Sequence, residues 1–293
     1  YMLQPITVEA QRQKLQLDQG DITMGSVGLP TSVIVITPED LERMAIFDIT
    51  DLFRRIPGLS VYNYDQGNIG FGLQLRGFRS AGAKDTAVYV DGVPMNLVQG
   101  KINGWVDIDW LIPEMIERIE IIKGPFSALY GDFALAGAIN ITTKKKDQSS
   151  IGASVGTYGT YGGVATISNL NWKVEPFLVW EGYNRDGYRD NSDYQRGQLF
   201  NKFTLPVWDG YLSGRLHYAA RDWGVSDYLK RSDVQSGRLE PTDTLDPTNE
   251  GDSDLLNFSL NYAPKNGEAG LHATAFVEDY SNDQAFYFRL IAH

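Results

Sequence analysis

The sequence predicts an α+β domain followed by antiparallel strands of a transmembrane β-barrel that is incomplete in this chain. Residues 30–146 mix strand and helix patterns, and the helical periodicity stops after the lysines at 144–146. About seven segments of roughly ten residues follow, in which apolar and polar residues alternate. Short turns and long loops alternate between these segments, which is typical of strands that cross an outer membrane. A soluble β-sandwich is the alternative that the residue alternation alone leaves open.

The composition limits the class of protein. A chain of 293 residues is long enough for two domains. It contains no apolar run of about 18 residues, so no transmembrane helix is expected. The 37 acidic residues exceed the 26 basic ones, which argues against binding to nucleic acid. The absence of cysteine excludes disulfides and cysteine metal sites.

The first domain opens with a predicted strand and two helices. Residues 32–36 (SVIVI) are rich in β-branched side chains and predict the strand. Thr37 is the expected N-cap of the next helix, because Pro38 follows at the first helical position. The second helix carries apolar side chains on one face: Ile49, Leu52, Phe53 and Ile56. The Pro-Gly pair at 57–58 ends it.

The rest of the first domain is predicted to be mainly strand. Residues 87–94 form a hairpin signal, in which Asp91-Gly92 supplies a turn with positive φ. A short helical turn, a strand, a tight connection and a strand then follow in order at 113–114, 118–122, 127–131 and 138–142.

Two of the later segments show the alternation most clearly. One face of the first carries Leu256, Phe258, Leu260 and Tyr262, and its other face carries Asn257, Ser259 and Asn261. In the second, Leu212, Gly214, Leu216, Tyr218 and Ala220 oppose Ser213, Arg215, His217 and Arg221. Short turns are expected near 169–171, 206–210 and 264–267, and long polar loops near 184–193 and 224–253.

Several short motifs occur in one order along the first domain. They are LRGF at 75–78, VYVDGVP at 88–94, IERIEIIKGP at 116–125, LYG at 129–131 and GAINI at 137–141. Together they resemble the plug domain of TonB-dependent outer-membrane receptors. The resemblance divides the chain into a flexible N-terminal segment at 1–29, a plug domain at 30–146 and the first roughly seven barrel strands at 147–293. The family's barrel has about 22 strands, so the resemblance implies a truncated barrel.

The resemblance also interprets an N-terminal segment with strand character. It is similar to the TonB box of the family and consists of Ile6, Thr7, Val8, Glu9 and Ala10. Its implied partner is a TonB-type energy-coupling protein with its inner-membrane proton-driven complex. A peptide that adds a strand to a partner's sheet gains main-chain hydrogen bonds. Ordering five mobile residues offsets much of that gain, so we expect weak, transient binding. A disordered terminus with chance strand propensity is the alternative.

A charge cluster between plug and barrel is the second implied site. By resemblance it contains Arg76 and Arg118 from the plug and Glu181 from the barrel. A buried arginine needs such a partner, because an unpaired buried charge is very costly. The alternative is that both arginines are solvated at the surface.

Ligand-binding candidates lie on plug loops that would face outward. They are Tyr62, Tyr64, Gln66, Arg79, Lys84, Asn96 and Gln99, and Tyr188, Trp223 and Tyr228 are weaker candidates from the barrel loops. Polar and aromatic side chains on loops over a rigid scaffold commonly form binding sites. The alternative for most of them is an ordinary solvated loop position.

No catalytic or metal site is expected. Asp186, Asp190 and Asp193 could attract calcium, but their spacing fits an exposed acidic loop better. The chain has three histidines, which are too scattered to suggest zinc or a catalytic triad. We therefore expect neither enzyme activity nor a covalently bound cofactor.

The resemblance implies active import of a scarce, bulky nutrient across the bacterial outer membrane, with the N-terminus in the periplasm. Besides the coupling protein, the implied partners are outer-membrane lipid and a small-molecule ligand. An iron–siderophore complex is the favoured ligand. Cobalamin, haem and glycans are the alternatives, as is a surface receptor or adhesin that transports nothing.

Overall fold

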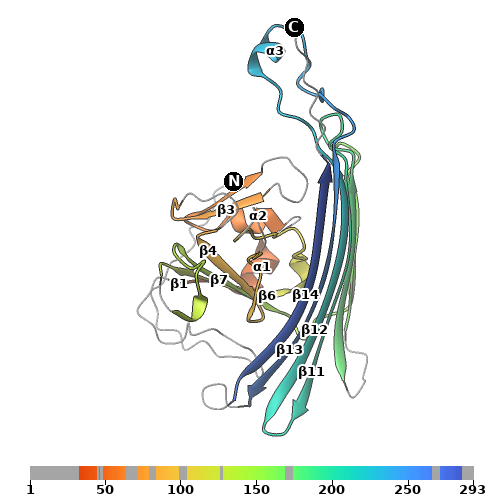
Figure 1. The fold of residues 1–293 in the computed structure, drawn as a ribbon. Coiled ribbons are helices and arrows are strands. Elements are labelled where there is room, and N and C mark those ends of the chain that lie inside the picture. Colours follow the sequence, from red (N-terminus) through yellow and green to blue (C-terminus); the bar gives the residue numbers. More distant parts are fainter. Residues whose placement is uncertain are drawn as a thin grey trace.

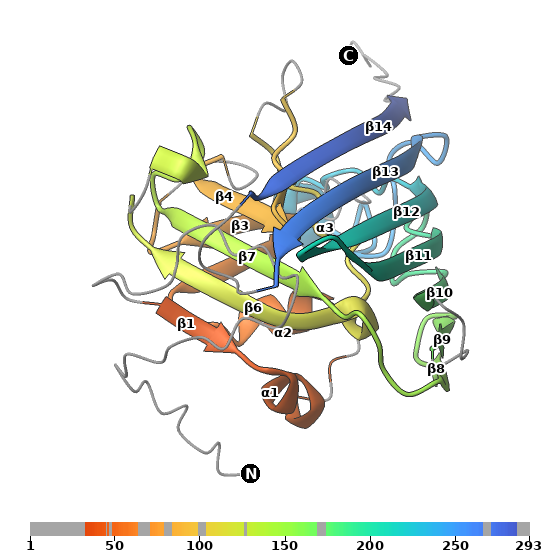
Figure 2. The same ribbon diagram turned by 90° about the horizontal axis from the view of Figure 1, so that it is seen from below.

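The computed structural model describes residues 33–44, 46, 49–63, 71–78, 84–98, 104–125, 128–168, 174–265 and 271–285. The segment at 6–10 lies outside the described residues. A mixed first domain lies on the concave side of a curved, open sheet that we call the C-terminal sheet (Figure 1). Seen from below, the C-terminal sheet curves round one side of the first domain (Figure 2). This is the predicted fold class.

The two predicted helices are present. Helix α1 spans Pro38–Arg43, and the Thr37 side chain caps it by accepting a hydrogen bond from the Asp40 main-chain nitrogen. The Asp40 carboxylate accepts in return from the Thr37 main-chain nitrogen at 3.1 Å, which completes a capping box. Helix α2 spans Ile49–Arg54 and buries the expected apolar face. The helices therefore follow directly from their caps and periodicity.

The first domain is built on a mixed sheet with strand order β1-β6-β7-β4-β5. Its strands are β1 (Val33–Ile36), β4 (Thr86–Val90), β5 (Val93–Pro94), β6 (Ile116–Lys123) and β7 (Gly137–Thr143). Strands β4 and β7 pair in parallel, and the other neighbours are antiparallel. Short 3-10 helices precede β6 and β7 at Pro113–Met115 (η4) and Ala128–Tyr130 (η5). A separate pair, β2 (Leu59–Asn63) with β3 (Phe71–Leu75), was not predicted.

The turn between β4 and β5 places one aspartate on the face toward the C-terminal sheet. Asp91 has φ 49° and Gly92 has φ 78°, as the predicted hairpin turn requires. The Asp91 side chain is buried, so this turn serves more than a change of chain direction.

The C-terminal sheet has seven antiparallel strands in sequence order. They are β8 (Ser150–Val155), β9 (Tyr161–Ile167), β10 (Glu175–Arg185), β11 (Tyr194–Val207), β12 (Gly210–Gly224), β13 (Glu250–Pro264) and β14 (Ala273–Ala285). Tight or short connections alternate with loops at 186–193 and 225–249, the second of which carries α3 (Arg231–Gln235) and projects from the top of Figure 1. Among the described residues, no helix is both long and apolar enough to cross a membrane.

The C-terminal sheet buries its polar face and exposes its apolar face. On β13, Asn257 and Ser259 are 1% and 0% exposed, whereas Leu256 and Phe258 are 46% and 40% exposed. A soluble sandwich does the opposite, because its apolar faces form the core. The inverted pattern excludes the sandwich alternative and suits a sheet whose outer face contacts lipid.

One apolar core joins the two parts of the chain. Leu52, Ile108 and Ile119 of the first domain belong to the same buried cluster as Phe177 and Phe200 of the C-terminal sheet. The sheet thus contributes a few apolar side chains to the core of the first domain, and its remaining inner face is polar.

Two glycines of the first domain give a test of this packing. A Cβ at Gly137 would lie 2.1 Å from the Ile122 carbonyl oxygen, whereas one at Gly131 would meet nothing within 4 Å. Both have positive φ, so both substitutions carry backbone strain. We expect Gly137→Ala to lower the free energy of unfolding by about 1 to 3 kcal/mol more than Gly131→Ala, as measured by denaturant unfolding. Equal losses would contradict the close packing of β7 on β6.

Candidate functional site

Three aspartates of the first domain meet basic side chains of the C-terminal sheet in a buried interface. Asp91 lies in the β4–β5 turn, and Asp107 and Asp109 lie in the segment 104–112 that leads to η4. Their residues are 8%, 2% and 4% exposed. Buried carboxylates of this kind require partners, because an unpaired buried charge costs several kcal/mol.

The partners come from alternate positions on two neighbouring strands. Arg196 and Lys202 lie on β11, and Arg215 and Arg221 lie on β12. The register sets Arg196 opposite Arg221 and Lys202 opposite Arg215. Like charges directly across a strand pair repel, so each basic pair is stabilised by an aspartate of the first domain.

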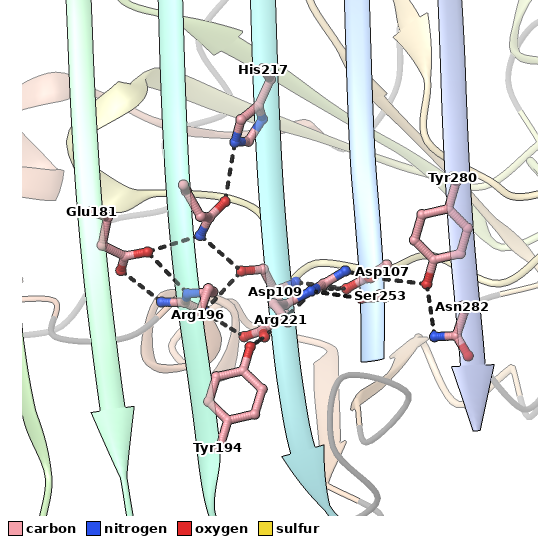
Figure 3. A network of polar contacts seen from close by, with 11 residues as sticks. Asp107, Asp109, Glu181, Tyr194, Arg196, His217, Arg221, Ser253, Tyr280 and Asn282 are labelled. Atoms are coloured by element: carbon pink, nitrogen blue, oxygen red, sulfur yellow. Dashed lines mark hydrogen bonds and ion pairs between the residues drawn. The ribbon is translucent and has the colours of Figure 1, made fainter. Parts of the chain in front are cut away.

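Asp107 forms a two-point contact with Arg221. The Arg221 Nη2 and Nη1 atoms donate to the Asp107 carboxylate at 2.6 and 3.1 Å (Figure 3). Arg221 Nε donates to Ser253 Oγ at 3.1 Å, and the Tyr280 hydroxyl donates to Asp107 at 3.4 Å. One carboxylate of the first domain is therefore held by side chains from β12 and β14, while β13 supports the arginine.

Asp109 is held by β11. Arg196 Nη1 donates to the Asp109 carboxylate at 2.8 Å and to its main-chain oxygen at 2.9 Å. The Tyr194 hydroxyl also donates to the Asp109 carboxylate. The other edge of Arg196 faces Glu181 of β10, with contacts of 2.7 and 3.0 Å, and Gln198 donates to Glu181 at 2.9 Å. Arg196 therefore bridges a carboxylate of the first domain and one of the sheet (Figure 3).

Asp91 joins the end of β7 to both strands. It accepts from the Thr143 main-chain nitrogen at 3.0 Å and from the Thr143 hydroxyl at 2.6 Å. Lys202 Nζ lies 3.1 Å from Asp91, and Arg215 Nη1 lies 3.5 Å from it. Arg215 also donates to the Val90 main-chain oxygen at 2.9 Å. Both basic residues therefore bind main-chain or side-chain oxygens of the first domain.

An aromatic contact lies among the ion pairs. The Trp110 ring meets the His217 ring edge-on, with centroids 4.9 Å apart. His217 is fully buried, and its Nε2 lies 3.1 Å from Gln198 Oε1 (Figure 3). The segment 104–112 therefore docks through apolar as well as charged groups.

The sheet cations decide the protonation state of the docked aspartates. Burial raises the pKa of the Asp91 carboxyl, but Lys202, Arg215 and the hydrogen bonds from Thr143 together lower it more, so its pKa lies below the ordinary value. Burial likewise raises the pKa of Asp109, and Arg196 and Arg221 bring it below the ordinary value. Both aspartates are therefore ionised at neutral pH.

Glu114 shows the reverse effect at the edge of the same interface. Burial raises its pKa, and the nearby Glu181 carboxylate raises it further. Lys144 and Arg196 lower the pKa of Glu114 but do not reverse the rise, so its carboxyl protonates more readily than that of a solvated glutamate.

The structure gives the predicted charge cluster other partners. Arg118 pairs with Glu120 of the same strand at 3.2 Å. Arg76 is exposed and has φ 55°. Glu181 pairs with Arg196 of the sheet. The expected cluster had arginines in the first domain and a carboxylate in the sheet. The described contacts have the opposite polarity, because the segment 104–112 supplies carboxylates and the inner face of β11 and β12 supplies cations.

Three of the predicted ligand candidates fall on described parts of the first domain. Tyr62 is 46% exposed, and its hydroxyl donates to Gln74. Lys84 is half-buried. Asn96 is buried, with Oδ1 accepting from the Val88 nitrogen at 2.9 Å and Nδ2 donating to two carbonyl oxygens. Its amide has a structural role, and the expectation that it faces a ligand was wrong for this state.

Of the remaining ligand candidates, some lie outside the described residues, and the others are either exposed or buried. Tyr64, Gln66, Arg79 and Gln99 lie outside the described residues. Tyr188 and Tyr228 are 55% and 67% exposed, whereas Trp223 is 2% exposed and so unavailable to a ligand. Within the described ranges, no group of three or more acidic or histidine residues could hold a metal ion, and the loop aspartates form no such group.

The sequence reasoning missed the docking aspartates. Asp91 was recognised only as a turn residue, and Asp107 and Asp109 were not singled out. The sequence does contain a signal that could have revealed these aspartates. Arg215 and Arg221 lie on the polar face of a strand whose other face is apolar. Cations directed into a barrel demand anionic partners from whatever fills it.

Comparison with known proteins agrees with this geometry. Residues 27–138 match the model of the TonB-dependent Receptor Plug Domain. The chain is 38% identical over 130 residues to a probable TonB-dependent siderophore receptor, PirA, of Acinetobacter baumannii, which covers 41% of this chain and 17% of that protein. It is 38% identical over 123 residues to the iron-regulated outer membrane virulence protein of Vibrio cholerae, covering 41% and 18%. The chain thus matches less than a fifth of the length of these relatives.

Solved structures resemble the whole fold. The alcaligin outer-membrane receptor FauA of Bordetella pertussis aligns with a TM-score of 0.64 at 19% identity, over 87% of this chain and 40% of that one. The unliganded ferric citrate transporter FecA aligns with a TM-score of 0.67 at 17% identity, over the same shares.

Fold and interface together define a plug domain held against the polar inner face of a membrane β-sheet. Residues 27–138 belong to the family of TonB-dependent receptor plug domains. The first domain is called the plug from here on.

The pair Asp107–Arg221 gives a quantitative test of docking. We expect Asp107→Asn or Arg221→Met alone to cost about 3 to 5 kcal/mol, because each leaves a buried charge unpaired. The double variant should cost less than the sum of the two, as a double-mutant cycle of denaturant unfolding would show.

A surface ion pair of the same length is the matched control. Arg238 and Asp233 lie 2.6 Å apart, as do Arg221 and Asp107, but the Arg238 side chain is 66% exposed. Its cycle should give less than about 1 kcal/mol. Similar coupling energies for the two pairs would contradict a buried docking contact.

The lowered pKa values predict loss of stability in acid. The unfolded aspartates bind protons at a higher pH than the docked ones, so the stabilisation is complete above about pH 4. It is lost as the pH falls through the lower pKa values of the folded state. Thermal unfolding between pH 7 and pH 3 should show this loss, and Asp91→Asn should be less stable at pH 7 but should approach the wild type at pH 3. Parallel pH curves would contradict the assignment.

Proposed function

We propose that the protein imports a ferric siderophore across the outer membrane, driven by a TonB-type coupling protein. The observation that carries this proposal is the plug that lies against the inner face of the sheet through aspartates paired with basic side chains. Such a plug closes the lumen at rest and has to be displaced or rearranged before a bulky solute passes. The relatives support the ligand class, since their names describe siderophore receptors and an iron-regulated protein.

The aspartate contacts hold the resting plug on one side, and the strand nearest the N-terminus lies on the other side. Asp107 and Asp109 dock the segment 104–112, and Asp91 docks the β4–β5 turn, all on the β11–β12 side. Strand β1 lies at the opposite edge of the plug sheet, and among the described strands it pairs with β6 alone, over four residues. In the proposed cycle, the coupling protein pulls on residues 6–10. The force reaches β1 first, because β1 is the first described element after the N-terminal segment.

The proposed partner contact is a strand addition at residues 6–10. Main-chain hydrogen bonds supply the attraction, and the cost of ordering the segment keeps the engagement short-lived. A short-lived engagement suits a protein that has to be released after each transport cycle. Ligand binding above the plug would make the segment available below, which couples occupancy to import.

The segment at 6–10 is tested by deletion. We expect a receptor that lacks residues 6–10 to bind its ferric siderophore with unchanged affinity and to lose uptake of the iron label. Deletion of residues 12–16, which shortens the same leader equally, should preserve uptake. Val8→Pro and Val8→Ala form a matched pair of point variants. Proline removes a main-chain donor from the added strand, so Val8→Pro should lower uptake more than Val8→Ala. Normal uptake without residues 6–10 would contradict the proposal.

The ligand class is tested by measuring the uptake of a panel of candidate nutrients. Cells that express the receptor as their only importer are supplied with ferric siderophores, cobalamin, haem or oligosaccharides, and uptake of each is measured. Uptake of a ferric siderophore that depends on residues 6–10 supports the proposal. Dependent uptake of one of the other nutrients would replace the ligand class, and uptake of none would favour a surface receptor or adhesin.

A further inference from the structure

A cavity lies at the end of the C-terminal sheet that carries the long loops. Its volume is about 270 Å³, and its walls come from the β8–β9 turn and the loop between β10 and β11. It is separate from the plug candidates discussed above, since all of its lining residues belong to the C-terminal sheet and its connections.

Two arginines line this cavity, and neither forms an ion pair with another described residue. The Arg185 guanidinium lies over the Tyr194 ring, 5.5 Å from its centroid. Arg189 Nη2 donates to the main-chain oxygens of Asp227 and Asp243 at 2.6 and 2.8 Å. The Nε atoms of both arginines are buried and have no hydrogen-bond partner. Two positive charges therefore border a cavity whose lining residues include no carboxylate, and the Asp186 carboxylate packs beside it against Gly159.

The walls of the cavity are fixed by main-chain contacts. The nitrogens of Asp186 and Gly187 donate to the Tyr158 carbonyl oxygen at 3.0 and 3.3 Å, which joins the loop to the turn. Gly187 has φ 84°, and a Cβ there would lie 2.1 Å from Ser192 Oγ. The loop thus closes on itself at a position that only glycine accommodates. A cavity with such walls exists before any ligand arrives.

The other lining groups suit a hydroxylated ligand. Tyr158 and Tyr188 form an edge-on pair with centroids 5.4 Å apart, and both are more than half exposed. Thr157 and Thr160 add hydroxyl groups to the wall. Tyrosine rings offer apolar faces beside polar edges, and a hydroxyl both donates and accepts.

We propose that this cavity binds a compact oxyanion, a carboxylate or phosphate carried on a hydroxylated ring or chain. Guanidinium groups match the planar geometry and charge of such an anion. Two sources share this chemistry: a phosphorylated sugar headgroup of the surrounding lipid, and an anionic soluble molecule that enters from outside. The assignment does not depend on transport.

The cavity borders the interface that docks the plug. Arg185 stacks on Tyr194, and the Tyr194 hydroxyl donates to Asp109 of the plug. An oxyanion bound beside Arg185 would therefore lie one aromatic side chain away from a docking aspartate. The cavity is therefore linked to the plug through Arg185, Tyr194 and Asp109.

Calorimetric titration of the purified receptor in detergent tests the site. Glucose 6-phosphate is the probe, and glucose is its neutral control. We expect binding of glucose 6-phosphate, no binding of glucose, and an affinity at least about tenfold weaker for Arg185→Gln, because a charged hydrogen-bond donor is lost. Arg238→Gln removes an arginine from the long loop outside the cavity and should leave the affinity unchanged.

A second variant covers the case in which Arg185→Gln does not fold. Tyr188→Leu changes an exposed ring, and it should weaken glucose 6-phosphate but leave inorganic phosphate unaffected. Failure of a wild-type receptor that carries no co-purified phosphorus to bind glucose 6-phosphate and phosphate would overturn the proposal. So would equal affinities for wild type, Arg185→Gln and Tyr188→Leu.

The source of the anion is resolved by a further measurement. Phosphorus that co-purifies with the wild type and is lost in Arg185→Gln identifies the lipid headgroup. Binding of added probe to a wild type that carries no phosphorus identifies the soluble source. Either result supports the oxyanion site.

Discussion

The contact between plug aspartates and the basic residues of β11 and β12 is the interaction on which the rest of the arrangement depends. Arg196 and Arg221 lie directly opposite each other, and both are almost fully buried. Without Asp107 and Asp109, Arg221 would lose both of its carboxylate partners, and Arg196 would keep only Glu181. Breaking a buried ion pair costs about 3 to 5 kcal/mol. In the proposed transport cycle, the same charges would become solvated when the plug moves and water enters.

The alternation of the strands sets up this interface. A strand with period two can present lipid with one face and the lumen with the other. Leu216 and Tyr218 of β12 are partly exposed on the outer face, whereas Arg215, His217 and Arg221 are buried against the plug. A shift of one residue in register would place the arginines in lipid. The pairing of β11 with β12 and the docking of the plug therefore depend on the same register.

Local features of the chain were predictable, and contacts between distant residues were not. The Thr37 cap, the Asp91-Gly92 turn and the alternation of β13 depend on neighbouring residues, and the structure contains all three. The β2–β3 pair was not predicted, although Gly67 and Gly70 lie between its strands. The partners of Asp107 follow only from the fold, because Arg221 lies 114 positions further along the chain. The expected cluster of Arg76, Arg118 and Glu181 came from family resemblance, which identified an interface but gave it the wrong polarity.

Thiol labelling tests the docking of the plug most directly, because the natural chain has no cysteine. Ser259 lies on the inner face of β13 and is 0% exposed. Ser232 lies on the exposed side of α3. In the resting receptor, a water-soluble maleimide should modify Ser232→Cys and leave Ser259→Cys unmodified. Equal labelling of the two would show that the inner face of the sheet is open to water and would contradict the docked plug.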